Sequence, residues 1–267
     1  MLIDTHCHLT YDDLAAQLDA VIDRAEQAGV RRLITIATDA SDARRAIGVL
    51  ERHPRVLLAA GVHPHQADCD ESVLCEIEEL HRGRWGGDAP GGRLVAVGET
   101  GLDFHYDFVP RPRQEQVFRR QIELALQVGR PIVIHARRSE ERVCDVLSEY
   151  SGLADRVVFH CFSGGVELAR RVLDLGFWLS FTGVVTFRNA DEIRQAAKFA
   201  PADRVMVETD APYLTPEPHR KVRPNEPAFV SHTARRLAEI RGESYDRLAE
   251  RTTANAVRFF GLAGDQA

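Results

Sequence analysis

The sequence predicts an α/β fold, a (β/α)8 barrel of the TIM type, and three observations support this. Short apolar runs alternate with amphipathic helical segments along the chain. Eight such strand–helix units can be counted. The length of 267 residues suits one barrel, and no linker or repeat divides it, so we expect residues 1–267 to form a single domain.

The predicted strands are nearly continuous apolar runs, as parallel strands covered on both faces require. They lie at residues 2–8, 32–37, 56–62, 94–99, 131–135, 156–160, 177–180 and 205–208. An open doubly wound sheet is the alternative, but it would need a glycine-rich turn after its first strand. The sequence His-Leu-Thr-Tyr stands there instead, so the closed barrel is favoured.

The segments between these strands carry apolar residues at helical spacing. Helices are expected at 11–29, 41–53, 72–81, 113–129, 139–150, 166–175, 190–199 and 226–241. A further segment at 244–260 is expected to pack on the outside as an extra C-terminal helix. The glycine-rich segment 83–93 predicts a surface insertion before the fourth strand, at the end of the barrel away from the active site.

Composition narrows the class of protein. The net charge of -6 excludes a generally basic coat for nucleic acid, although it allows a local basic groove. The five cysteines form no Cys-x-x-Cys pair, so neither a disulfide framework nor a cysteine zinc site is indicated. The chain begins without a signal peptide pattern, and no apolar run reaches the length of a membrane span. We expect a cytoplasmic protein without membrane contact, with a monomer favoured.

The first strand carries two histidines, His6 and His8, two positions apart. Residues at this spacing in a strand share a face, so both imidazoles point the same way, with Asp4 beside them and Cys7 on the opposite face. Two imidazoles next to a carboxylate are typical of a transition-metal site. A pair of packed histidines would give the same short motif, so the interpretation depends on the other strands.

In such barrels the active site lies at the carboxyl ends of the strands. Six predicted strands deliver a histidine or an acidic residue to that end: His6 and His8, His63 and His65, Glu99, His135, His160, and Asp210. By contrast, His53, His81 and His232 fall in helices and are expected on the solvated surface. A buried ring of imidazoles and carboxylates without a metal would carry a large desolvation cost, so we predict a metal centre.

The predicted ligands offer only nitrogen and oxygen donors, and they are too many for one four-coordinate zinc. They are His6, His8, Glu99, His135, His160 and Asp210. Two divalent cations that share a carboxylate, roughly 3.5–4 Å apart, would account for this number. We assign the two histidines of the first strand and Asp210 to one cation, the histidines of strands five and six to the other, and Glu99 to both. Such donors suit Mg, Mn, Zn, Ni or Co.

Six segments together resemble the TatD-type metal-dependent deoxyribonucleases, a family of amidohydrolase-like barrels. The segments are 4–8 (DTHCH), 61–65 (GVHPH), 98–103 (GETGLD), 131–137 (PIVIHAR), 160–164 (HCFSG) and 208–213 (ETDAPY). The resemblance covers essentially the whole chain. It implies a TIM barrel with one to three divalent metals that hydrolyses phosphodiester bonds, often 3′→5′ on single strands, and its ligands correspond to the six residues above. Many relatives carry HRGKRNEP where this chain has HRKVRPNEP at 219–227, so the geometry of this loop is expected to differ.

These features predict a hydrolase that cleaves DNA, in particular single-stranded DNA, with RNA as a second candidate substrate. Water activated by two metals would attack the phosphorus atom, and Asp210 would accept its proton. Glu99 would bridge the metals, and His63 would assist at the phosphate or at the leaving oxygen. Glu208 and Asp4 are expected to orient the histidine ligands.

Candidate substrate contacts lie next to these ligands. They are His65, Arg137 and Tyr213, and the planar guanidinium of Arg137 suits a phosphate. An ion pair with a carboxylate at the rim is the alternative for Arg137. Phe104, Tyr106 and Phe187 also follow strand ends, where they would either stack bases or pack loops against the barrel.

Two other functions stay open at this point. The same metals could hydrolyse an amide or an ester, as in a D-aminoacyl-tRNA deacylase. Other amidohydrolase-like barrels often bridge their metals with a carboxylated lysine, and the glutamate at position 99 favours the nuclease family instead. A metal-dependent binding protein with little turnover is the third interpretation, and the complete set of ligands argues against it.

Overall fold

The computed structural model describes residues 1–85, 91–106 and 108–262, and within them eight parallel strands pair in sequence order. The strands are β1 (Leu2–Cys7), β2 (Val30–Ala37), β3 (Val56–Ala60), β4 (Leu94–Asp103), β5 (Ile132–Arg137), β6 (Val157–Phe159), β7 (Trp178–Phe181) and β8 (Val205–Val207). A parallel bridge between Cys7 and Ala211 brings the end of β8 back to β1. The predicted (β/α)8 barrel is therefore confirmed.

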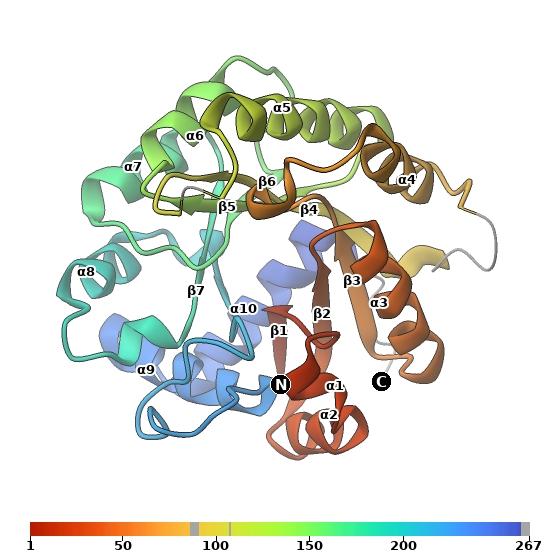
Figure 1. The fold of residues 1–267 in the computed structure, drawn as a ribbon. Coiled ribbons are helices and arrows are strands. Elements are labelled where there is room, and N and C mark those ends of the chain that lie inside the picture. Colours follow the sequence, from red (N-terminus) through yellow and green to blue (C-terminus); the bar gives the residue numbers. More distant parts are fainter. Residues whose placement is uncertain (86–90, 107, 263–267) are drawn as a thin grey trace.

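Helices surround the strands (Figure 1), most of them as an outer ring. They are α1 (Asp12–Ala15), α2 (Leu18–Gln27), α3 (Ala40–Arg52), α4 (Glu71–His81), α5 (Arg111–Val128), α6 (Glu140–Ser148), α7 (Val166–Asp174), α8 (Asp191–Phe199), α9 (Val230–Arg241) and α10 (Tyr245–Phe260). The predicted helix over 11–29 is divided in two, and a short 3-10 turn, η5 (Pro227–Phe229), precedes α9. No helix in the described residues is long and apolar enough to cross a membrane.

The predicted extra C-terminal helix is present as α10, but the expectation that it packs on the outside was wrong. Phe259 and Phe260 of α10 join the apolar cluster inside the barrel, where Phe259 packs against Trp178 at a ring distance of 5.5 Å. Asn255 of the same helix donates hydrogen bonds to the carbonyl oxygens of Ala202 and Val205, at the beginning of β8. The helix thus covers the amino ends of the strands, because burial of its two phenylalanines stabilises it there.

Strand β4 is longer than predicted, and this extension shapes the site. Its backbone passes through two glycines with positive φ, Gly98 at 134° and Gly101 at 141°, and then continues to Asp103. The pairing with β5 shifts register between Val97 and Thr100. A Cβ atom on Gly101 would lie 2.0 Å from the carbonyl oxygen of His135, so only glycine fits there.

The predicted insertion at 83–93 lies partly outside the described residues, which omit 86–90. Its final part forms a 3-10 turn, η2 (Gly91–Arg93), immediately before β4. That position is at the amino end of the strand, as predicted. The carboxyl ends of the strands meet at the opposite end of the barrel, where the polar residues gather.

Candidate metal centre

Glu99 lies at the centre of the predicted ligands, because β4 places its carboxylate among imidazoles from four other segments. Its Oε1 is 2.8 Å from a ring nitrogen of His135, 2.8 Å from His160 and 3.7 Å from His63, and its Oε2 is 3.4 Å from His6. Burial alone would raise the pKa of Glu99. The surrounding imidazoles, His160 and His6 first, hold the pKa well below its usual range, so this carboxylate is anionic.

The histidines of β1 converge on the carboxylate that follows β8. Oδ1 of Asp210 lies 3.7 Å from Nε2 of His6 and 3.4 Å from Nε2 of His8. Burial opposes ionisation of Asp210, but these histidines and His160 lower its pKa below the usual value. The predicted grouping of the first-strand histidines with Asp210 is present in the geometry.

Buried nitrogen atoms without a partner mark the same place. Both ring nitrogens of His6 and Nδ1 of His8 are buried and form no hydrogen bond with a described residue. Such atoms are costly to bury unless something binds them. Burial together with the nearby His160 lowers the pKa of His6, so the neutral ring keeps a lone pair on one of its two nitrogens. Unprotonated imidazole nitrogens beside anionic carboxylates are suitable ligands for a divalent cation.

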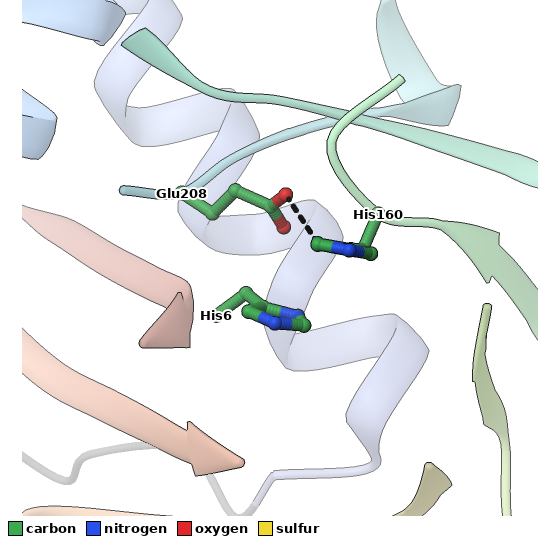
Figure 2. A group of neighbouring side chains, drawn as sticks. All are labelled: His6, His160 and Glu208. Carbon is green, nitrogen blue, oxygen red and sulfur yellow. Dashed lines mark hydrogen bonds and ion pairs between the residues drawn. The ribbon is translucent and has the colours of Figure 1, made fainter. Parts of the chain in front are cut away.

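His160, a predicted ligand, is held between two carboxylates. Its Nδ1 donates to Oε1 of Glu208 at 3.2 Å (Figure 2). Its Nε2 lies 2.8 Å from Oε1 of Glu99. The ring also stacks on His6 with a centroid distance of 3.8 Å. Glu208 in turn accepts hydrogen bonds from Ser180 and from the backbone of Cys161. The predicted orienting role of Glu208 agrees with these contacts, because a carboxylate on one nitrogen fixes the other as the ligand.

His135 has an equivalent support that the sequence did not reveal. Its Nε2 donates to Oδ2 of Asp103 at 3.0 Å, while its Nδ1 faces Glu99. Oδ2 of Asp103 also binds Nε2 of His65 at 2.9 Å, and its Oδ1 accepts the backbone amides of His105 and Tyr106. Asp103 was visible in the motif at 98–103, but the predicted end of the strand at Glu99 left it in a loop.

His63 lies beside the predicted ligands, but its hydrogen bonds differ from theirs. Three groups bring potential ligand atoms within 4.8 Å of one another: His6, His160 and Glu208; His6, His8 and Glu99; and His63, Glu99 and His135. In His63, however, Nδ1 accepts the backbone amide of His65 at 3.1 Å. Burial and the neighbouring His135 hold the pKa of His63 well below its usual range, so the ring is neutral. Its Nε2 therefore carries the proton, and it lies 3.3 Å from Nδ1 of His135.

Asp4 does not orient a histidine ring, contrary to the prediction. Its carboxylate accepts hydrogen bonds from the amide and the hydroxyl of Thr209, at 2.9 and 2.6 Å, and from the amide of His6. Burial raises the pKa of Asp4 to about 8. Asp4 thus connects β1 to the segment after β8, and it positions the backbone that carries Asp210.

A cavity of about 690 Å³ opens above these ligands, within the range of small-molecule sites. Its wall includes the three predicted substrate contacts, His65, Arg137 and Tyr213. Arg137 has no ion-pair partner among the described residues, so the alternative role as an ion-pair residue finds no support. The guanidinium lies over the ring of Tyr106 at 4.8 Å instead.

The other predicted stacking residues divide into two kinds. Phe104 and Phe187 are partly buried against the core, and Arg111 and Arg220 cover their rings at 4.4 and 4.0 Å. These two therefore pack loops against the barrel. Tyr106 and Tyr213 are exposed and line the cavity.

One histidine predicted at the surface is buried. His81 is only 3% exposed, with Nε2 bound to the carbonyl oxygen of Ala60 and Nδ1 facing Arg130. The expectation was wrong because His81 follows Ile77 by one helical turn and shares the inner face of α4. His53 pairs with Asp19, and His232 is half-buried beside His219. None of these three lies in the cavity wall described above.

The comparisons with known proteins agree with this geometry. The family model described as TatD related DNase matches residues 3–261. A relative from Bacillus subtilis, named "uncharacterized metal-dependent hydrolase YabD", is 40% identical and covers 98% of this chain and 100% of its own. A relative from Erwinia tasmaniensis, named "3'-5' ssDNA/RNA exonuclease TatD", is 33% identical over 98% of this chain and 100% of its own.

Solved structures lead to the same group. The structure of YjjV, described as a TatD homologue from Escherichia coli K12, is 29% identical and superposes with a TM-score of 0.91 over 98% of each chain. The barrel, the ligand geometry and the match over nearly the whole sequence agree with one another. The chain belongs to the TatD family of metal-dependent hydrolases.

Proposed function

We propose that this hydrolase is a nuclease that removes nucleotides from the 3′ end of single-stranded DNA, with RNA as a second substrate. One observation carries the proposal: Glu99 is shared by imidazoles from several strands, in a cavity whose wall also holds the exposed cation Arg137. A site for two divalent cations beside a guanidinium group favours binding of an anionic phosphodiester. The name of the Erwinia relative supports the same substrate class.

The residues present fit two divalent cations. His6, His8 and Asp210 would hold one, His135 and His160 the other, and Glu99 would contact both. The buried nitrogens of His6 and His8 that form no hydrogen bond support this assignment. Bound divalent cations supply acidified water at neutral pH and neutralise the charge on the phosphate oxygens.

Asp210 is suited to accept the proton of the attacking water. Its Oδ1 faces His6 and His8, which leaves Oδ2 for the proton. The side chain keeps 14% exposure and lines the cavity, so water reaches it. Its lowered pKa keeps it ionised, as a base requires.

His63 and Arg137 would act on the phosphate side. The protonated Nε2 of neutral His63 faces the ligands and can donate a hydrogen bond to a phosphate or leaving oxygen. Arg137 presents a planar fork of donors at the cavity wall. Nε2 of His65 is already bound to Asp103, so we propose that His65 only contacts the substrate as part of the cavity wall.

The proposal is tested with chelator-stripped protein and each of Mg²⁺, Mn²⁺, Zn²⁺, Ni²⁺ and Co²⁺ added back. Substrates are 5′-labelled single-stranded DNA, single-stranded RNA and a D-aminoacyl-tRNA. The expected result is stepwise shortening of the labelled strands from the 3′ end, with release of mononucleotides. This activity should disappear in Glu99→Ala and Asp210→Asn. Glu51→Ala, which changes an exposed carboxylate on α3, serves as the matched control.

Two results would overturn the nuclease proposal. The first is intact nucleic acid with every metal, while the ester of the D-aminoacyl-tRNA is cleaved. The second is a cleavage that Glu99→Ala retains, because a contaminating nuclease would then be responsible.

A further inference from the structure

Three exposed aromatic side chains line the same cavity in the described part of the chain. Six large apolar side chains are exposed among the described residues, and three of them line the metal cavity: Tyr106, Phe108 and Tyr213. Phe108 is 65% exposed, so most of its ring keeps its contact with water. Aromatic rings left exposed together at a cavity indicate a binding surface. Phe108 was not singled out by the sequence.

Tyr106 and Phe108 are arranged as a stack. Their ring planes differ by 2°, and their centroids are 5.1 Å apart. The imidazole of His65 meets both rings edge-on, at 5.4 Å from Tyr106 and 4.8 Å from Phe108. The rings are thus supported from the side while the face of Phe108 stays accessible.

The same stack is anchored to the metal centre. Asp103 accepts the backbone amide of Tyr106 at 3.0 Å, and its other oxygen holds His65 and His135. The position of the rings is therefore tied to the carboxylate that orients a metal ligand. A substrate group stacked on these rings would therefore be held at a fixed distance from the metal centre.

A cation completes the arrangement. Arg137 follows the ligand His135 by two residues, and its guanidinium lies 4.8 Å from the centroid of the Tyr106 ring. Sites for single-stranded nucleic acid combine these two elements, aromatic rings for the bases and cations for the backbone.

We propose that Tyr106 and Phe108 form a stacking platform for one nucleobase of the substrate, with Arg137 at an adjoining phosphate. This inference rests on the proposed nuclease function, and it specifies which wall of the cavity holds the base. Every base has a face that can stack, so the platform accepts any sequence. It requires an unpaired base, so a single strand would bind better than a duplex.

The test measures binding to the metal-loaded protein by fluorescence anisotropy. The probe is a 5′-fluorescein pentadeoxyadenylate with phosphorothioate linkages, which resist cleavage, and five derivatives each lack the base at one position. The variants are Phe108→Ala and the conservative Phe108→Tyr. Phe199→Ala is the matched control, because Phe199 is also exposed and covered by an arginine, Arg170, but lies outside the cavity.

Phe108→Ala is expected to weaken binding of the complete probe roughly 5- to 150-fold, the range for loss of one stacked base. Phe108→Tyr and Phe199→Ala should bind like the wild type. One derivative should bind the wild type more weakly than the complete probe does, by the same factor. Phe108→Ala should bind that derivative and the complete probe with equal affinity. This coupling identifies the stacked base, and a merely structural role of Phe108 would not produce it.

Equal affinity of Phe108→Ala and the wild type for the complete probe would overturn the platform. The platform would also be overturned if Phe108→Ala reduced the affinity by the same factor, relative to the wild type, for the complete probe and for all five derivatives. If the wild type cleaves unmodified DNA and either result is found, the nuclease function stands without the platform. If the coupling is found while neither DNA nor RNA is cleaved, the platform stands and the nuclease function fails.

Discussion

Nε2 of His135 donates a hydrogen bond to Oδ2 of Asp103 at 3.0 Å, and this contact decides which nitrogen of His135 faces the metal centre. A neutral imidazole has one protonated nitrogen and one lone pair. Nδ1 lies 2.8 Å from Oε1 of Glu99; with a cation bound, the proton would stay toward Asp103 and Nδ1 would be the ligand atom. His160 shows the same arrangement with Glu208. Each of the two histidines assigned to the second cation thus has its own supporting carboxylate.

The first prediction concerns Asp103→Asn. An asparagine amide placed against His135 and His65 donates hydrogen bonds where the carboxylate accepted them, so His135 would have to carry its proton on Nδ1. The affinity for a divalent cation should fall about 10- to 100-fold, as for other supporting residues of metal ligands. Calorimetric titration of the chelated protein with Mn²⁺ measures this.

Asp19→Asn is the matched control for this experiment, because Asp19 pairs with His53 at the surface. The control should bind Mn²⁺ like the wild type. Thermal unfolding of the chelated proteins checks that Asp103→Asn is folded. An unchanged Mn²⁺ affinity in folded Asp103→Asn would refute the orienting role.

A second prediction concerns Glu99→Gln and the stabilisation that metal binding confers. A ligand that binds only the native state stabilises it by about 2.7 kcal/mol at a hundredfold excess over its dissociation constant. The wild type should therefore unfold at a higher temperature with Mn²⁺ than with chelator. Glu99→Gln should lose most of this difference, because the carboxylate shared by both proposed sites becomes neutral.

Calorimetry with and without Mn²⁺ measures the effect, and elemental analysis after dialysis counts the bound cations. Glu51→Gln should behave like the wild type. Two cations bound per chain of Glu99→Gln would contradict the bridging assignment.

Much of the site follows from local patterns in the sequence. The alternation of side chains in a strand places His6 and His8 on one face, and both rings meet Asp210 as expected. The apolar runs identify the strand ends, so the positions of His135 and His160 beside Glu99 could be predicted without a structure. Both inferences use only neighbouring residues, which is why sequence alone could support them.

The errors arise where distant contacts or unusual backbone decide the outcome. Gly98 and Gly101 interrupt the apolar pattern, yet the strand continues through them with positive φ, and Asp103 was missed for this reason. Alternation gave the face of Asp4 but not its partner Thr209, which is 205 positions away. The exposure of Phe108 depends on the path of a loop, and no pattern in the sequence encodes it.

Gly101→Ala is predicted to destabilise the protein by about 3 kcal/mol or more. The methyl group would lie 2.0 Å from the carbonyl oxygen of His135, so β4 and β5 must separate next to a metal ligand. The positive φ of 141° adds strain for any residue with a side chain. Metal affinity should fall as well, because Glu99 and His135 lie on these two strands.

Gly29→Ala is the control that separates backbone strain at positive φ from the steric clash of the added methyl group. Its φ is also positive, at 84°, but no atom lies within 4 Å of the added methyl group. Only about 1 kcal/mol should be lost there, without a change in metal affinity. Urea unfolding of both variants measures the difference, and equal losses would show that the contact with His135 is unimportant.

The last prediction follows from His81, which the structure buries between Ala60 and Arg130. Burial lowers the pKa of His81 from 6.5 to about 4. In the unfolded chain His81 therefore binds a proton near pH 6.5, whereas in the native state its ring stays neutral down to about pH 4. Since the unfolded state binds more protons in this window, the free energy of unfolding falls as the pH decreases from 6.5 to 4.

Between pH 7.5 and 5.5 this one group should reduce the stability by about 1.4 kcal/mol. Urea unfolding of the chelated wild type and of His81→Gln at both pH values isolates the effect, because all other groups titrate in both proteins. His81→Gln should show the smaller loss, although it is less stable at pH 7.5. His105→Gln, which removes an exposed histidine, should follow the wild type. If His81→Gln and the wild type lost equal stability, the native state would have to accept a proton on His81, and its burial could not be what keeps the ring neutral.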